Sequence, residues 1–195
     1  MCLIGDFVMT IIIINERGIF SDSKMVVGNN INYCGLNTTD KFIVSDQKDI
    51  VVNYSGNAYT KESGLRVIEC LRPYIKECIE ANKELLISPD VFDTACANLM
   101  RDYNDTILFL TKDRTLTLKR MKDGAFLLGS YGLDFSYIYG SGEFWAAPVI
   151  LNPFVQDRDL TERSIEAVVR AIKYDSQCGG EVRYLLREQL QDIIL

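Results

Sequence analysis

The sequence contains no histidine among its 195 residues. This absence excludes catalysis by Ser-His-Asp or Cys-His groups within one chain, because both arrangements need an imidazole base. Most catalytic zinc sites also use histidine ligands, and we predict neither a metal nor another cofactor. A hydrolase of this composition must take its base from a carboxylate, a lysine or an α-amine.

Three further features are missing. Lysine and arginine number 21 against 27 aspartates and glutamates, with a net charge of −6, so the basic face of a nucleic-acid binder is not expected. None of the six cysteines forms a C-x-x-C pair, which argues against a zinc ribbon or a thioredoxin-like motif. No apolar run approaches the roughly 20 residues of a membrane-spanning helix. We therefore expect a protein of the reducing cytoplasm, without a nucleic-acid or membrane partner.

The sequence has the composition of an ordinary globular domain. Its apolar fraction is 48% and its charged fraction 25%, which is enough to build a core without disulfide bonds. Internal repeats, linkers and low-complexity segments are not evident. We therefore treat residues 1–195 as one domain, with residues 1–9 as a leader or propeptide.

Hydrophobic periodicity predicts the order of the secondary structure. Two β-hairpins come first, followed by two helices, four more strands, a short helix, a longer helix and a last strand. Pro73 is expected to bend or split the first helix, and Thr161 to cap the longer late one. The predicted strands are 10–14, 19–23, 41–45, 50–54, 106–111, 115–119, 125–128, 135–139 and 182–187, and the main helices are 58–82, 89–100 and 160–174.

This order argues against alternating βαβ units and a parallel sheet. Consecutive hairpins give antiparallel sheets, and the helices that follow them cover the outer faces. The sequence therefore predicts an α+β fold, a layered αββα sandwich of two antiparallel sheets flanked by helices.

Five short motifs stand at the ends of these elements. Taken singly, each has an ordinary structural explanation, such as a solvated charge, a turn or a helix cap. Taken in order along the chain, they form a set. The motifs are Asp22-Ser23-Lys24, Lys41 before an apolar strand, Gly56 between a strand and a helix, Gly140-Ser141-Gly142, and Asp175-Ser176-Gln177-Cys178-Gly179-Gly180.

The ordered set, preceded by the β-branched run from Thr10, resembles the proteasome β subunits and the related HslV-type peptidases. These are N-terminal-nucleophile (Ntn) hydrolases. The resemblance covers nearly the whole chain, and its closing segment is more similar to the proteasome type. It implies a four-layer αββα fold, a homo-oligomer such as a ring, and a peptide or unfolded protein as substrate. The sequence does not identify a partner ATPase.

The resemblance also assigns roles that suit a chain without histidine. Thr10 would be the nucleophile, with its own α-amine as base once that amine is free. Lys41 would favour the alkoxide by its charge, and Asp22 would hold Lys41. The backbone N–H of Gly56 would stabilise the oxyanion. A supporting network around the amine would consist of Ser141, Asp175 and Cys178.

Several alternatives stay open at this level. Thr10 must be freed by self-cleavage after Met9 or by translation from Met9. Counting back strictly from Gly18 places Met9 at the nucleophile position, which would make the protein inactive. Cys2 is another N-terminal nucleophile, although the residues after it do not continue the strand. The family's serine is replaced by Cys178, whose thiol is a weaker hydrogen-bonding group. The two hypotheses are thus a threonine-type peptidase and an inactive relative that acts as an oligomeric scaffold or binding module.

Overall fold

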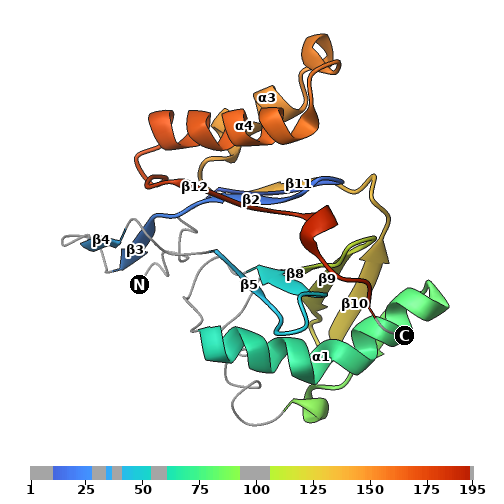
Figure 1. The fold of residues 1–195 in the computed structure, drawn as a ribbon. Coiled ribbons are helices and arrows are strands. Elements are labelled where there is room, and N and C mark those ends of the chain that lie inside the picture. Colours follow the sequence, from blue (N-terminus) through green and yellow to red (C-terminus); the bar gives the residue numbers. More distant parts are fainter. Residues whose placement is uncertain (1–10, 28–33, 37–40, 54–60, 93–105, 194–195) are drawn as a thin grey trace. The chain divides into compact units, whose positions relative to one another are not determined.

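The structure is a computed structural model that describes residues 11–27, 34–36, 41–53, 61–92 and 106–193. Two of the predicted site residues, Thr10 and Gly56, lie outside these ranges. The chain divides into two compact units (Figure 1): residues 1–41 with 136–186, and residues 42–135 with 187–195. Among the described helices, none is long and apolar enough to cross a membrane.

The first unit is built on a four-stranded antiparallel sheet in the order β11-β1-β2-β12. The predicted first hairpin is present, and the N–H of Asn15 donates to the carbonyl of Gly18 at 3.0 Å to close its turn. Only glycine fits at position 18, because a Cβ there would lie 2.1 Å from the Leu185 carbonyl oxygen of β12. The strands are β1 (Ile12–Ile14), β2 (Gly18–Asp22), β11 (Tyr137–Tyr139) and β12 (Val182–Leu186).

Two helices, α3 (Glu143–Ile150) and α4 (Leu160–Tyr174), lie on one face of this sheet (Figure 1). Side chains of β1 and β2, including Ile13 and Phe20, share a buried cluster with apolar residues of both helices. This burial explains the apolar face of α4, whereas β1 is apolar at every position because all three of its residues are buried.

The predicted cap of α4 was wrong. Asp159, not Thr161, is the N-cap, and its carboxylate accepts the N–H groups of Thr161 and Glu162 at 2.8 and 3.2 Å. A carboxylate also interacts more favourably with the positive end of the helix dipole than a hydroxyl does.

A short ribbon completes the described part of the first unit. It pairs β3 (Met25–Val27) with β4 (Cys34–Leu36) in antiparallel register.

The second unit contains a six-stranded antiparallel sheet in the order β5-β6-β8-β9-β10-β7. Its long strands were predicted, but the edge strand β7 was not. The bounds are β5 (Phe42–Val44), β6 (Val51–Asn53), β7 (Leu85–Ile87), β8 (Ile107–Leu110), β9 (Thr115–Arg120) and β10 (Phe126–Tyr131).

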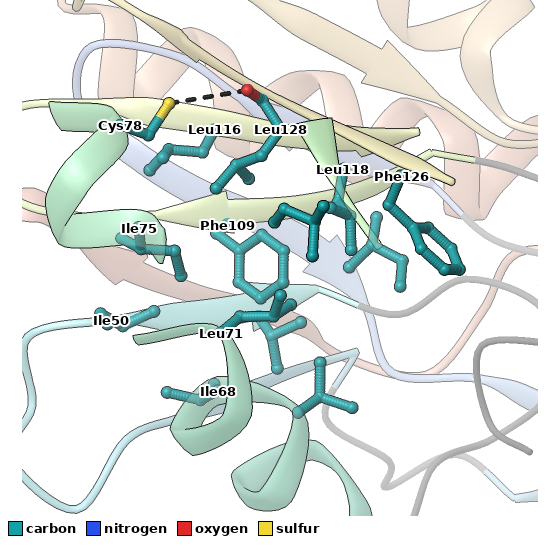
Figure 2. Close-up of a cluster of buried hydrophobic side chains, with 14 of the residues drawn as sticks. Ile50, Ile68, Leu71, Ile75, Cys78, Phe109, Leu116, Leu118, Phe126 and Leu128 are labelled. Atoms are coloured by element: carbon teal, nitrogen blue, oxygen red, sulfur yellow. Dashed lines mark hydrogen bonds between the residues drawn. The ribbon is translucent and has the colours of Figure 1, made fainter. Parts of the chain in front are cut away.

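Helix α1 (Lys61–Ala81) packs on this sheet and runs unbroken through Pro73. The predicted split of the helix was therefore wrong. Pro73 is exposed, so the backbone carbonyl that loses its partner on that side of the helix is solvated. Figure 2 shows the core beneath α1, where Leu71 and Ile75 of the helix join Phe109 of β8.

The second predicted helix is described only at its beginning. Ser88 accepts the N–H of Asp90 at 3.4 Å, and a 3-10 turn, η1 (Pro89–Val91), follows. Its continuation through residues 93–100 lies outside the described ranges. Two further 3-10 turns are η2 (Pro153–Val155) and η3 (Arg187–Gln189).

Candidate active site

Asp22 ends strand β2 with its side chain fully buried. Its Oδ1 atom accepts the backbone N–H of Ile11 at 3.0 Å, and its Oδ2 atom accepts the N–H of Gly179 at 3.1 Å. The β1-β2 register explains the first bond, because Ile12 pairs with Ser21 and the next pair outward is Ile11 with Asp22. One carboxylate therefore links the residue before β1 to the segment after α4.

The segment after α4 is organised by Asp175, the C-cap of the helix. Its Oδ1 atom accepts the N–H of Gln177 at 2.9 Å, and its carbonyl accepts the N–H of Cys178 at 3.1 Å. The thiol of Cys178 donates to Asp175 Oδ2 at 3.5 Å. Gly180 leaves this turn with φ of 75°, a conformation that favours glycine. The Cys-Gly-Gly sequence thus forms a tight turn that presents Cys178 inward.

Gly142 lets three segments approach one another closely. A Cβ at this position would lie 2.8 Å from Ala171 Cβ, 2.8 Å from Cys178 Sγ and 3.0 Å from Ile11 Cβ. Real Cβ atoms rarely come so close to other atoms. The neighbouring Ser141, whose Oγ atom is buried, is thereby held beside Cys178.

Ser23 and Lys24 add contacts whose roles the sequence did not reveal. Ser23 Oγ accepts the N–H of Glu181 at 2.8 Å. The Lys24 N–H donates to the carbonyl of Gly179 at 3.1 Å, and its Nζ atom donates to the carbonyl of Ser176 at 2.7 Å. In the sequence, the one indication of these contacts is that both residues directly follow Asp22. These bonds continue the attachment of β2 to the 175–180 turn.

Lys41 is buried, with only 7% of its surface exposed. Burial lowers the pKa of its amine below 10.5, because a buried ammonium loses hydration. The negative charge of Asp22, and to a lesser extent that of Cys178 when ionised, acts in the opposite direction. Lys41 therefore lies within the electrostatic reach of both residues, in the same unit of the chain.

Cys178 is kept as a neutral thiol. Burial makes the largest contribution to raising its pKa. The charges of Asp22 and Asp175 and the hydrogen bond to Asp175 raise the pKa further. The Ser141 hydroxyl has the opposite, smaller effect. A thiol in this state can donate a hydrogen bond but is a poor nucleophile.

Five of the seven predicted site residues therefore lie in one cluster of the first unit: Asp22, Lys41, Ser141, Asp175 and Cys178. The other two, Thr10 and Gly56, belong to the ranges that the structure leaves undescribed. Within the described ranges, no group of three or more His, Cys, Asp or Glu side chains is placed to hold a metal ion. The catalytic roles of all seven stay predictions.

Solved structures of proteins of the proteasome and HslV kind share this fold. The two larger antiparallel sheets and their helices form an α+β fold like theirs, so the predicted fold class is confirmed. Eukaryotic HslV from Trypanosoma brucei matches with a TM-score of 0.58 and 15% identity, over 91% of this chain and 98% of that one.

BPH from Thiobacillus denitrificans gives a second match, at 15% identity. In complex with epoxomicin it matches with a TM-score of 0.51 over 91% of this chain and 97% of that one. BPH alone matches with a TM-score of 0.51 over 91% and 96%. No protein-family model and no curated protein matches the sequence.

Proposed function

We propose that the chain is a threonine-type peptidase whose nucleophile is Thr10, freed as the first residue of the mature chain. The observation that carries this proposal is the position of Asp22. It holds the N–H of Ile11, the residue directly after Thr10, and it is the charge with the largest opposing effect on the pKa of Lys41. A carboxylate, a buried amine and the backbone beside the nucleophile thus come from three separate segments.

The proposed chemistry uses the freed α-amine as base. Such an amine has a pKa of roughly 7.7–8.0, so it is partly unprotonated at neutral pH. It takes the proton of the Thr10 hydroxyl as the oxygen attacks the peptide carbonyl, and the proton then passes to the leaving amine. Water, activated by the same α-amine, hydrolyses the resulting ester and restores Thr10.

Two other groups would stabilise the negative charge that develops. Lys41 in its protonated form would favour the alkoxide, and the charge of Asp22 favours that form of Lys41. We propose that the backbone N–H of Gly56 donates to the oxyanion. Such pre-positioned donors contribute more in a water-excluded site than they would in bulk water.

The cluster of Ser141, Asp175 and Cys178 would position the α-amine. The Asp175 carboxylate accepts hydrogen bonds from both Gln177 and Cys178, so its orientation is fixed. Cys178 replaces the hydroxyl that the resemblance predicts at this position, and the weaker donor should reduce the rate without abolishing it.

The test compares chains that begin at Thr10 with chains that retain residues 1–9. Both should be assayed for hydrolysis of short peptides, alongside Thr10→Ala and Thr10→Ser made in the same shortened chain. We expect hydrolysis by the Thr10 chain, loss with Thr10→Ala and partial retention with Thr10→Ser. Hydrolysis that survives Thr10→Ala would overturn the assignment. Intact-mass measurement of the purified protein establishes whether Thr10 becomes the first residue.

The second candidate function is a catalytically inactive scaffold or binding module. It is favoured by one observation: both carboxylate oxygens of Asp22 already accept backbone N–H groups, so a structural role is sufficient to explain this residue. A Thr10 chain that assembles normally and hydrolyses no peptide would support this candidate. Epoxomicin, the compound in the BPH complex, is a useful additional probe, since its binding to the Thr10 chain would favour the peptidase.

Assembly and substrate belong to the same proposal. We propose a homo-oligomer, such as a ring, that acts on peptides or unfolded proteins in the cytoplasm. The fold shared with HslV and BPH supports this. Buried, neutral thiols such as Cys78 and Cys178 suit a reducing compartment.

A further inference from the structure

Asn53 ends strand β6 as a buried residue, with only 2% of its surface exposed. Asparagine is depleted in strands, and the two residues before it in β6 are valines. A buried amide also needs hydrogen-bond partners to offset its loss of hydration. Neither strand propensity nor hydrophobicity therefore accounts for this residue, and its contacts must explain it.

The side chain of Asn53 replaces one backbone acceptor of the β-ladder. The pairing of β6 with β8 stops at Val52 and Phe109, and the next pair outward is Asn53 with Leu108. At that point the N–H of Leu108, itself a buried residue, donates to Asn53 Oδ1 at 3.3 Å. Because a side chain satisfies this donor, the backbone of β6 can leave β8 here without an unpaired N–H.

Asn53 also lies opposite the start of β5. It pairs with Phe42, the first residue of that strand, and Lys41 directly precedes Phe42. Lys41 is not part of the pairing, so the pair of Phe42 and Asn53 is the last step of the ladder before the buried amine. Through its two neighbours, Asn53 links the backbone beside Lys41 to β8.

The rest of the β5–β6 hairpin is held at other points. At its turn, the buried carboxylate of Asp49 accepts a hydrogen bond from the guanidinium of Arg72 on α1. In the middle, α1 approaches so closely that a Cβ on Gly64 would lie 2.2 Å from Ile43 Cδ1. The turn is about 14 Å from Lys41 along β5, at roughly 3.4 Å per residue. Among the side-chain anchors of the described hairpin, the one at its open end is therefore nearest to Lys41.

We propose that Asn53 is a positioning residue of the candidate active site. By holding the open end of the β5–β6 hairpin against β8, it fixes the backbone that carries Lys41, and with it the place of the amine near Asp22. The kinetic consequence rests on the proposed peptidase function, whereas the position of Lys41 does not. A displaced charge stabilises the transition state less without changing substrate binding, and a shift of about 1 Å can cost about a hundredfold in rate.

The first experiment follows Lys41 itself and needs no activity. The amine is titrated by NMR in lysine-labelled protein, and its signal is assigned by its absence in Lys41→Met. Burial lowers the pKa of Lys41 below 10.5. Asn53→Leu keeps the size of the side chain but removes the acceptor, so water should reach the amine and raise this pKa by about half a unit or more toward its usual value. A Lys41 pKa equal to that of the wild type, or below it, would overturn the proposal.

Thr111→Val is the matched control. Thr111 is similarly buried, at 3% exposed, and its Oγ1 atom accepts the backbone N–H of Arg114 at 3.1 Å in the turn after β8. This variant also removes a buried side-chain acceptor, so its urea midpoint should fall as that of Asn53→Leu does, but the pKa of Lys41 should not change. Equal pKa shifts in both variants would mean a general loosening of the sheet and would contradict a specific role of Asn53. Circular dichroism checks that each variant is folded.

The second experiment measures hydrolysis in chains that begin at Thr10. Asn53→Leu should lower kcat at least about tenfold and leave KM within about twofold, whereas Thr111→Val should change neither. A raised KM with an unchanged kcat would contradict a positioning role. If the wild-type Thr10 chain hydrolyses no peptide, the peptidase proposal fails, and the titration of Lys41 still decides whether Asn53 fixes its position.

Discussion

Asp22 and Gly179 stand 157 positions apart in the sequence, yet the N–H of Gly179 donates to Asp22 Oδ2 at 3.1 Å. The same carboxylate accepts the N–H of Ile11 through Oδ1. A buried acceptor bonded by two backbone donors fixes both segments around it, because either donor left unpaired would cost roughly 1–3 kcal/mol. Asp22 is thus a structural centre of the first unit as well as a proposed partner of Lys41.

The first prediction follows from this geometry. Asp22→Asn keeps the size of the side chain but turns an amide NH2 toward one of the two backbone donors. We expect unfolding free energy to fall by about 1–3 kcal/mol, with loss of any peptide hydrolysis. Urea unfolding gives the value, and the exposed Asp46→Asn serves as control. A stability equal to wild type would show that the two hydrogen bonds are replaceable.

The second prediction concerns pH. Because burial lowers the pKa of Lys41 below 10.5, the folded chain binds fewer protons than the unfolded chain between that lowered pKa and 10.5. Stability therefore rises with pH across this window, and the burial of the Lys41 amine costs stability below it. Lys41→Met should be more stable than wild type at pH 7, with the difference narrowing toward pH 10.

Urea unfolding of both proteins at each pH reports on Lys41 together with its electrostatic partners Asp22 and Cys178, since titrations elsewhere in the chain are shared. A wild type that is more stable than Lys41→Met at pH 7 would mean that Asp22 compensates fully for the burial of the amine. Under the proposed peptidase function, the same variant should also lose any peptide hydrolysis, because the charge proposed to favour the alkoxide is gone.

The third prediction concerns thiol reactivity. Burial raises the pKa of Cys78 to about 11 and raises that of Cys178 as well. The thiolate is the reactive form, so at pH 8 both residues should react with iodoacetamide at least about a hundredfold more slowly than in the urea-unfolded protein. Peptide mapping by mass spectrometry resolves each cysteine. Fast labelling of folded Cys178 would show that the 175–180 turn opens readily.

The fourth prediction tests the close approach at Gly142. Gly142→Ala would place a methyl group against Cys178 Sγ and Ala171 Cβ, both at 2.8 Å. We expect a loss of about 1–3 kcal/mol in unfolding free energy, typical of overpacking. Adding Ala171→Gly should recover part of it by removing one of the opposing atoms, despite its own helix cost of about 1 kcal/mol. A fully stable Gly142→Ala protein would contradict the tight packing.

Much of the fold could be predicted from the sequence because its signals are local. The β-branched run that includes Ile12 is typical of a strand. The four-residue spacing of Leu71 and Ile75 matches the helical period. Strand β7 was not predicted because three residues are too few to show a strand period, and its middle residue, Leu86, is exposed. The N-cap at Asp159 was missed because the following threonine is an equally good capping residue type.

The site was only partly accessible to the same reasoning. The motifs located Asp22 and Cys178, but the bonds from Ser23 to Glu181 and from Lys24 to Ser176 depend on a register between strands far apart in sequence. Local patterns do not encode such pairings. The exposed side of α3 was not predicted either, because an apolar sequence alone indicates a buried helix.

The order of segments in the first unit has a consequence for synthesis. Strands β1 and β2 complete their sheet by pairing with β11 and β12, from residues 136–186, and residues 42–135 are made in between. A chain emerging from the ribosome therefore cannot complete the surroundings of Asp22 until the turn at Gly179 has been translated. Any hydrolytic capacity would therefore arise late, in a nearly finished polypeptide.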